Sequence, residues 1–215
     1  MSTPTLLSAD ADLHQLPPHE AASGMTALGQ ALLQVLAQRH SEREFAPTPL
    51  STALLGQLLW AAGGVNRDDT GLRTNPTAKN WQEIDVYVAR EDGLFLYEAA
   101  GNALRKLSSD DLRGATGWQD FVAQAPVNLV YVADLARMDH APTREQKFYA
   151  ALDTGYISQN VYLFCAAQGL ATVARAWVDR PALAGAMHLR EGQRIILAQS
   201  VGYPRHPKRS AGLPH

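Results

Sequence analysis

The chain has 215 residues, of which 46% are hydrophobic and 19% charged, so it suits one folded domain and argues against wholesale disorder. Its formal net charge of −2 argues against a general nucleic-acid binder, which needs a broad basic face. The single cysteine, Cys165, excludes an intramolecular disulfide and zinc sites built on paired thiolates, and the seven histidines show no recognisable metal-ligand spacing.

The N-terminus shows no targeting pattern. Residues 1–12 contain no basic residue and no long apolar run, so we expect no secretory signal. No stretch approaches the roughly 18–20 apolar residues of a membrane span. We therefore expect a cytoplasmic protein with no membrane partner, although a secreted form whose signal has been removed would look the same.

The first quarter of the chain is predicted to be an arm followed by two helices. Residues 1–22 contain three prolines among small and polar residues and predict an irregular arm, with a single domain over 23–215. Apolar side chains recur at helical spacing between residues 24 and 39. Ser51 is the expected N-cap of a second helix, which the glycines at 63 and 64 would end.

A loop and a strand meander are predicted next. Residues 65–81 are polar, and loops of that length inside a compact domain are usually functional or disordered. Period-two alternation over 84–88 and a second apolar run over 94–97 surround a turn signal, which predicts a hairpin. Residues 103–107 would extend it.

The second half of the chain completes an α+β pattern. Residues 127–133 are apolar nearly throughout and predict a central strand. Residues 143–168 predict one long helix closed by Gly169. The shorter predicted elements are helices over 108–113, 118–124 and 180–188, strands over 171–174 and 194–201, and a tail rich in proline and basic residues over 202–215.

The long helix carries apolar or small side chains on nearly every face. Phe148, Leu152 and Tyr156 lie on one side and Ile157 on another. A helix that is apolar all round is buried all round, so in a chain of this size we expect it to pack against a second copy. The alternative is a central helix in a monomeric core.

Two polar segments carry the strongest functional signal. Arg39-His40-Ser41-Glu42-Arg43 places two guanidinium groups, an imidazole and a hydroxyl at the end of the first helix, a combination that suits a phosphate group. The segment Arg73-Thr74-Asn75-Pro76-Thr77-Ala78-Lys79-Asn80 is a tight polar turn whose small side chains let backbone amides approach a flat ring. Surface ion pairing with neighbouring glutamates is the alternative explanation of the first segment.

In their order and separation these segments resemble the nitroreductase superfamily of FMN-dependent oxidoreductases, and most of all the short branch near the SagB-type, azoline-oxidising dehydrogenases. The resemblance covers roughly Leu28 to Pro204. The other segments that carry it are residues 58–67, residues 153–160 with 169–173, and Val201-Gly202-Tyr203-Pro204.

The resemblance implies a nitroreductase-like α+β fold: a central, mostly antiparallel sheet flanked by helices, and a long buried helix at a homodimer interface. It also implies two FMN sites built by both subunits. The residues implied around the phosphate are Arg39, His40, Ser41 and Arg43 with Lys208 and Arg209. Those implied to line the flavin from the other subunit are Pro76, Thr77, Ala78 and Asn80. A third implied segment presents a backbone N–H to flavin N5 and consists of Ala174, Arg175, Ala176 and Trp177.

The chain departs from the family pattern in that last segment. Where many members have a proline and a glutamate, it has Ala174 and Ala176, a change that keeps a backbone N–H contact and loses a carboxylate contact. Arg175 is a candidate cation beside the flavin or a charged substrate. We expect no other catalytic side chain and no metal, because the flavin would carry the chemistry.

The implied reaction passes a hydride from NAD(P)H through flavin N5 to a small oxidised acceptor such as a nitroaromatic or a quinone. The alternatives are a flavin-dependent dehydrogenase or oxidase of azoline or destructase type, a flavin-binding protein without turnover, and a plain dimerisation module. Cys165 is predicted to be a buried small hydrophobe. The four tryptophans are predicted to be core or interface residues, with Trp177 the strongest candidate to stack on a flavin.

Overall fold

The computed structural model describes residues 25–138 and 140–206. The chain divides into two units, Met1–Ala37 and Gln38–His215. The predicted first helix is confirmed as α1 (Ala27–Gln38), slightly shorter than its apolar pattern. The predicted arm over 1–22 lies outside the described residues, and the single domain over 23–215 stays a prediction.

Helix α2 (Thr52–Gly63) begins and ends as predicted. The Ser51 hydroxyl accepts the N–H of Leu54 at 3.2 Å, which satisfies a donor that the first turn leaves free. Leu55, Leu58 and Leu59 are buried, and the helix packs against the long helix of the second half.

The predicted loop over 65–81 is partly wrong. Strands β1 (Val65–Arg67) and β2 (Leu72–Arg73) pair antiparallel, and a single 3₁₀ turn covers Ala78–Asn80. The strands are too short to show a period-two pattern, and a side-chain bond from Arg67 Nη2 to the Arg73 carbonyl at 2.7 Å helps to hold them. The long polar segment is therefore ordered by local hydrogen bonds.

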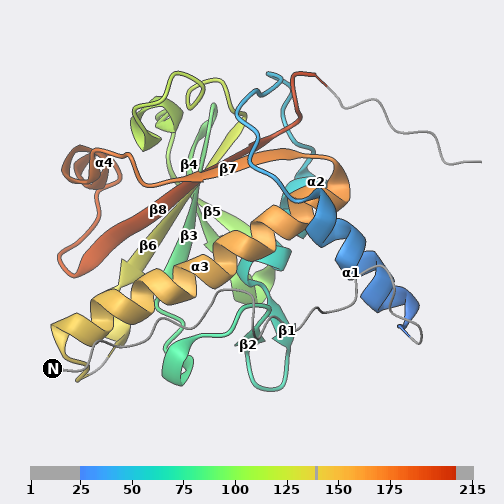
Figure 1. Ribbon diagram of the computed structural model, residues 1–215. Helices are drawn as coiled ribbons and strands as arrows, with labels where there is room; N and C mark the ends of the chain where they lie inside the picture. Colours follow the sequence, from blue (N-terminus) through green and yellow to red (C-terminus); the bar gives the residue numbers. More distant parts are fainter. Residues whose placement is uncertain (1–24, 139, 207–215) are drawn as a thin grey trace, which may run out of the picture. The chain divides into compact units, whose positions relative to one another are not determined.

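Six strands form one sheet in the order β5-β4-β3-β6-β8-β7, and every pair in it is antiparallel (Figure 1). The central position predicted for residues 127–133 is confirmed, because β6 is buried along its whole length. The strands are β3 (Ile84–Arg90), β4 (Gly93–Glu98), β5 (Ala103–Ser108), β6 (Val127–Asp134), β7 (Ala171–Arg175) and β8 (Gln193–Gly202).

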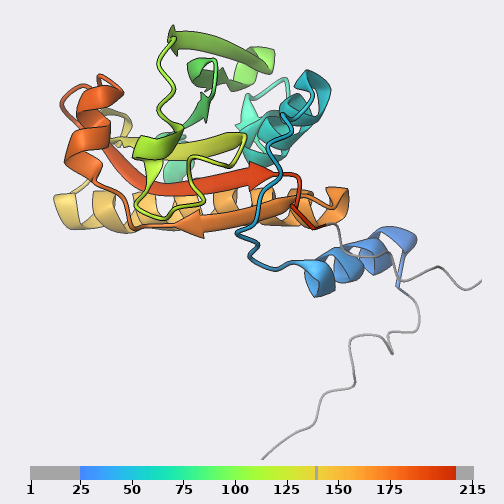
Figure 2. The same ribbon diagram turned by 90° about the horizontal axis from the view of Figure 1, so that it is seen from above.

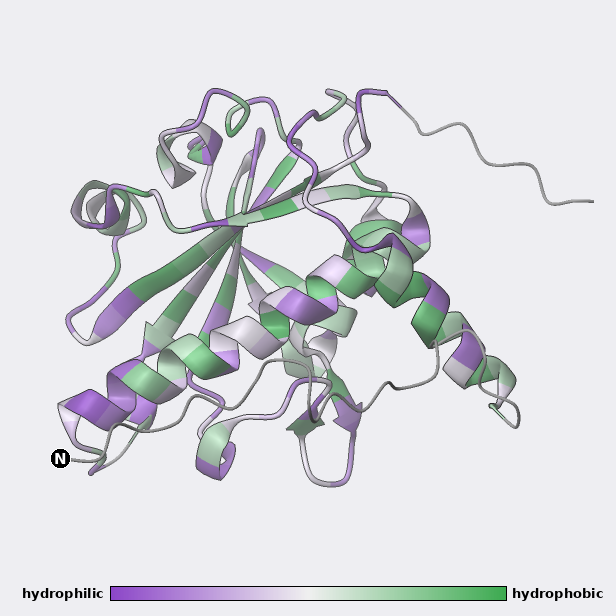
Figure 3. Cartoon of the chain, in the orientation of Figure 1, coloured by the Kyte–Doolittle hydropathy of each residue, from purple (hydrophilic) through white to green (hydrophobic). Residues whose placement is uncertain are grey.

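Helices cover both faces of the sheet. Helix α3 (Thr143–Gln168) runs across one face, and the short helix α4 (Arg180–Ala186) packs on the other (Figure 2). Gly169 ends α3 with a φ of 65°, a left-handed conformation that glycine adopts without strain. Side chains that alternate along the strands build one apolar core under α2 and α3 and another under α4. The hydrophobic residues of the strands are coloured green in Figure 3.

Helix α3 is not buried all round within the described residues of one chain. Ile157, on the sheet side, is 2% exposed. On the other side Phe148 is 62% exposed, Leu152 38% and Tyr156 39%. We call these last three residues the α3 stripe; they follow each other at four-residue intervals and therefore form one continuous apolar face.

Two predicted short helices are wrong. Residues 118–124 form turns, and residues 108–113 form the end of β5 and a bend, with a 3₁₀ helix only at Arg113–Thr116. Ser108 Oγ accepts the N–H of Asp110 at 2.9 Å and Asp111 Oδ1 accepts that of Arg113 at 3.1 Å. Such bonds resemble helix caps in sequence, but here they stabilise turns that compete with a helix.

Candidate functional site

The first polar segment, residues 39–43, is anchored along the edge of the sheet. The N–H of Glu42 donates to the carbonyl of Thr172 in the edge strand β7 at 2.9 Å. Three residues beyond the segment, the N–H of Ala46 donates to the carbonyl of Tyr203 at 2.8 Å. The segment therefore lies beside the same strand whose end carries residues 174–177.

Its cationic side chains are available to an anion. Arg39 is half-buried, with its Cζ 5.4 Å from the centre of the Tyr162 ring, and Arg43 is exposed. Within residues 25–138 and 140–206, no carboxylate lies within 4 Å of either guanidinium, so the ion-pairing alternative is wrong for this part of the chain. His40 is also exposed, and its Nδ1 lies 2.8 Å from the carbonyl of Gln38.

Tyr162 of α3 connects this segment to the end of β7. Its hydroxyl oxygen accepts the N–H of Ala174 at 2.9 Å and lies 2.9 Å from Ser41 Oγ. Because the phenol accepts from Ala174, its own proton is free to be donated to Ser41. The sequence analysis missed Tyr162, which carries no signal beyond a tyrosine in a long helix.

The end of β7 presents backbone N–H groups outward. In an edge strand every second residue turns its N–H and C=O away from the neighbouring strand. Thr172 and Ala174 do so in β7, since their backbone groups bond Glu42 and Tyr162. Ala176, whose small side chain is exposed, is the first residue after β7, and its N–H would have the same direction if the alternation continued by one step.

The second polar segment, residues 73–80, contacts a different part of α3 through its second half. The N–H of Ala78 donates to Asp153 Oδ2 at 2.9 Å. Asp153 and Tyr162 are nine residues apart, which is about 13.5 Å along a helix axis at 1.5 Å per residue. One chain therefore holds the two polar segments at separate points of α3, with Pro76 and Asn80 exposed and Thr77 and Ala78 half-buried.

A buried pair of carboxyl groups underlies this segment. Glu83 is 0% and Asp153 1% exposed. Both Glu83 oxygens and Asp153 Oδ1 have no hydrogen-bond partner among the described residues. Burial, reinforced by the Asp153 carboxylate, raises the pKa of Glu83 to about 7, and burial also raises the pKa of Asp153. With a proton on Glu83 the two carboxyls can share a hydrogen bond.

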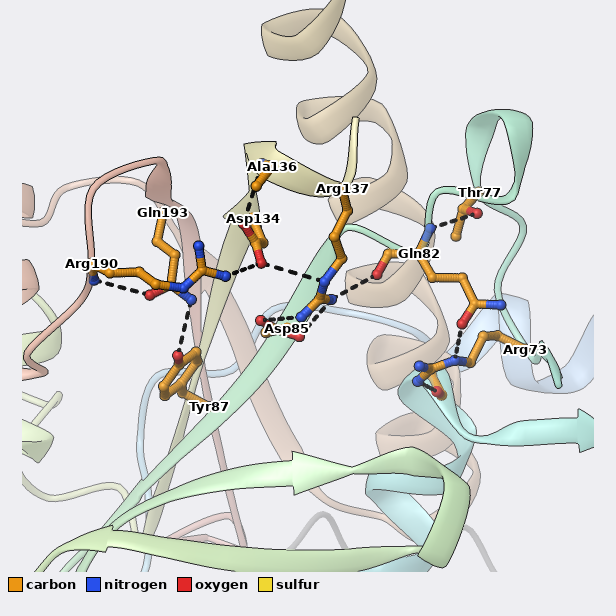
Figure 4. A network of polar contacts seen from close by, with 11 residues as sticks. Arg73, Thr77, Gln82, Asp85, Tyr87, Asp134, Ala136, Arg137, Arg190 and Gln193 are labelled. Carbon is orange, nitrogen blue, oxygen red and sulfur yellow. Dashed lines mark hydrogen bonds and ion pairs between the residues drawn. The ribbon is translucent and has the colours of Figure 1, made fainter. Parts of the chain in front are cut away.

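A polar network holds the chain that follows Asn80 (Figure 4). It lies beside a cavity of about 490 Å³ that Thr77 and Asn80 also line. Arg73 Nε donates to Gln82 Oε1 at 2.9 Å, and Arg137 Nη1 donates to the Gln82 carbonyl at 2.9 Å. Arg137 also pairs with Asp85 at 2.8 Å and with the buried Asp134 at 3.4 Å. These bonds fix the segment to β3 and β6.

The Arg175 side chain does not face the same edge. It is 5% exposed, and its guanidinium donates to Thr116 Oγ1 at 3.0 Å, Asn128 Oδ1 at 2.6 Å and Ser200 Oγ at 3.2 Å. The expectation that this cation touches a flavin or a charged substrate is therefore wrong. Burial, which penalises its charged form, lowers the pKa of Arg175 to about 10.

Several other expectations are decided by burial. Cys165 is buried and its pKa is raised to about 12, which confirms that it is not a reactive thiol. Trp118 is 59% and Trp177 66% exposed, so neither is a core residue of the described chain. Lys208 and Arg209 lie outside the described residues.

The described part of the chain holds no group of three or more histidine, cysteine, aspartate or glutamate side chains that could bind a metal ion, and none of its helices has the length and apolar character needed to cross a membrane.

The model of the nitroreductase family matches residues 36–203, most of the chain and all of the segments anchored around β7 and α3. The chain belongs to the nitroreductase family. The nitroreductase-like fold predicted from the sequence is confirmed. Nitroreductases are generally flavin-binding dimers, and membership makes this protein a flavin oxidoreductase in general terms.

Individual relatives agree with this membership. A protein of Methanocaldococcus jannaschii assigned to the nitroreductases is 30% identical over 153 residues, which are 66% of this chain and 77% of that one. A crystal structure of a nitroreductase from Ralstonia eutropha JMP134 has a TM-score of 0.79 at 41% identity and covers 89% of each chain. The NADPH:FMN oxidoreductase of Vibrio harveyi, in complex with NAD⁺, shares the fold with a TM-score of 0.63 at 16% identity, over 85% of this chain and 73% of that one.

Proposed function

We propose that this nitroreductase is an FMN-dependent oxidoreductase that passes a hydride from NAD(P)H through flavin N5 to a small oxidised acceptor, such as a nitroaromatic or a quinone. The observation that carries the proposal is the juxtaposition made by Tyr162. This one hydroxyl contacts Ser41, in a segment whose arginines have no carboxylate partner among the described residues, and accepts the outward N–H of Ala174 at the edge of β7.

The donors at one end of this arrangement fit a phosphate. Arg39 and Arg43 have no carboxylate partner among the described residues, and the Ser41 hydroxyl lies between them in sequence. Guanidinium groups form short, charge-assisted hydrogen bonds with phosphate oxygens. We place the FMN phosphate here, with His40 beside it, and keep Lys208 and Arg209 as predicted partners from the tail.

The other end fits the flavin ring. FMN, when bound, supplies the N5 position that accepts and returns a hydride. The chain's part is to hold the ring, and we propose that residues 174–177 offer the N–H of Ala176, whose own side chain is small. A backbone donor held by a sheet edge keeps its direction through the reaction, which is what preorganised electrostatic stabilisation requires.

A second copy of the chain would complete the site. The α3 stripe is an exposed apolar face. If two α3 helices cross antiparallel about a two-fold axis level with residues 157–158, the partner's Asp153 comes level with Tyr162. The partner's Pro76, Thr77, Ala78 and Asn80 would then line the flavin held by this chain. A homodimer thus joins two polar segments that one chain keeps apart.

The test is the visible spectrum of the purified protein, followed by acid release and chromatography of the bound chromophore. We expect FMN at about one per chain. The Arg43→Ala variant should bind FMN 10- to 100-fold more weakly, because a hydrogen bond to a charged group contributes about 1.5–3 kcal/mol. Arg194→Ala removes another exposed arginine, at the start of β8, and should bind FMN like the wild type.

A colourless protein that takes up no added FMN would overturn the cofactor and the roles of Arg39, Ser41 and Arg43 together. If FMN is bound, NAD(P)H oxidation with a quinone acceptor tests the reductase. Bound FMN without NAD(P)H turnover would favour a flavin-binding protein. Oxidised or fragmented products formed under air would favour a dehydrogenase or oxidase of azoline or destructase type.

A further inference from the structure

The Arg175 guanidinium is a buried cation whose partners among the described residues are all neutral. It bonds the carbonyl and hydroxyl of Thr116, the amide oxygen of Asn128 and the hydroxyl of Ser200. Among the described residues no carboxylate lies within 4 Å of it. A buried charge is normally paired with an opposite charge, because removing an ion from water is costly. Within residues 25–138 and 140–206, the Arg175 charge is compensated only by neutral dipoles.

The surroundings are shaped to hold this side chain. A Cβ on Gly117 would clash with Arg175 Nη1 and lie 2.9 Å from Gln119 Oε1, so a larger residue at 117 would require these side chains to move. Gln119 Oε1 is itself buried without a hydrogen-bond partner among the described residues. Four polar groups from three separate segments therefore bond one cation and give its charge a definite position.

That position is directly behind the proposed flavin-facing edge. Arg175 immediately precedes Ala176 in the chain. The Thr172 hydroxyl accepts from the Gln199 amide, which also bonds Ser158 of α3, whereas Val173 packs with Phe45 in a separate cluster. Because strand side chains alternate, Arg175 shares the face of Val173, away from α3. The charge thus lies one side-chain length from the outward N–H, with the strand in between.

Hydride addition to a neutral flavin leaves one extra negative charge, so the oxidised and reduced forms differ in charge. A cation in a region of low dielectric acts on such a charge without touching it. We propose that Arg175 is a positioning residue whose buried charge favours the reduced form of the flavin held at the β7 edge and so raises its midpoint potential. This inference rests on the proposed function.

The experiment is a spectroscopic redox titration of the FMN-loaded protein. Arg175→Met should lower the midpoint potential, with at least a tenfold loss in the affinity for reduced relative to oxidised FMN, or about 30 mV for a two-electron couple. Arg175→Lys keeps the charge and should restore most of the potential. Arg105→Met removes an arginine from β5, at the opposite edge of the sheet, and should leave the potential unchanged.

A second variant covers the case in which Arg175→Met fails to fold. Asn128→Asp places a carboxylate of nearly the same shape at the guanidinium, whose Nη2 lies 2.6 Å from Asn128 Oδ1. It neutralises the charge without emptying the site and should also lower the potential. An unchanged potential in a variant that binds FMN would overturn the inference and leave the proposed function intact. A wild type that binds no FMN would overturn the proposed function itself and this inference with it.

Discussion

Replacing Glu83 by glutamine should stabilise the protein at alkaline pH and change its stability little at acid pH. Glu83 is 0% exposed, and neither of its oxygens has a hydrogen-bond partner among the described residues. Its neighbour is a second buried carboxyl, Asp153. A glutamine amide could donate to Asp153 Oδ1, which also lacks a partner there.

The magnitude follows from the pKa of Glu83, which burial and then Asp153 raise from 4.5 to about 7. The folded state binds this proton more tightly than the unfolded state does, so the free energy of unfolding falls as the pH rises from about 4.5 to about 7. At 1.36 kcal/mol per pKa unit the loss is about 3 kcal/mol. Glutamine cannot ionise, so Glu83→Gln should avoid this loss above pH 7.

The assay is urea unfolding at pH 5 and pH 8, at one protein concentration and one FMN loading. We expect the variant to exceed the wild type by about 2–3 kcal/mol at pH 8 and by much less at pH 5. Glu98→Gln is the control, because Glu98 is exposed and pairs with Arg105 at 2.7 Å, a surface ion pair worth 0–1 kcal/mol. If Glu83→Gln is less stable than the wild type by the same amount at pH 5 and pH 8, ionisation of Glu83 does not destabilise the folded protein and the reasoning is refuted.

Three further predictions address single contacts. Tyr162→Phe leaves the N–H of Ala174 without its acceptor and should lower the free energy of unfolding by about 1–3 kcal/mol, measured in urea, and weaken FMN binding. Unchanged FMN affinity in this variant would show that the Tyr162 hydroxyl does not contribute to the FMN site. Arg137→Met leaves the buried Asp134 with one ion-pair partner fewer and should cost about 3 kcal/mol in urea unfolding at pH 7. Gly169→Ala forces a side chain into a φ of 65° and should lower stability by about 1 kcal/mol with no change in the flavin spectrum, which thermal unfolding would show.

The sequence determined the elements whose signals are local. The Ser51 cap and the long periodic helix ending at Gly169 appear where their patterns predicted them, because capping and left-handed glycine depend on neighbours a few residues away. The apolar run of β6 also predicted its central place. The helices predicted between residues 108 and 124 were wrong, because the serine and aspartate side chains that suggested helix caps accept hydrogen bonds that stabilise turns instead.

For the candidate site, the sequence determined the residue types and only the tertiary structure decided what they face. The arginines around Ser41 remain without carboxylate partners in the described chain, as a phosphate site requires. Arg175, one residue from the predicted N5 contact, points into the protein because its strand position sends its side chain to the face away from α3. Tyr162 and the buried Glu83 gain their importance from contacts across many intervening residues, and no local pattern records such contacts. Contacts between residues so far apart in the sequence form only when the sheet and α3 pack together, so the tertiary structure was needed to find them.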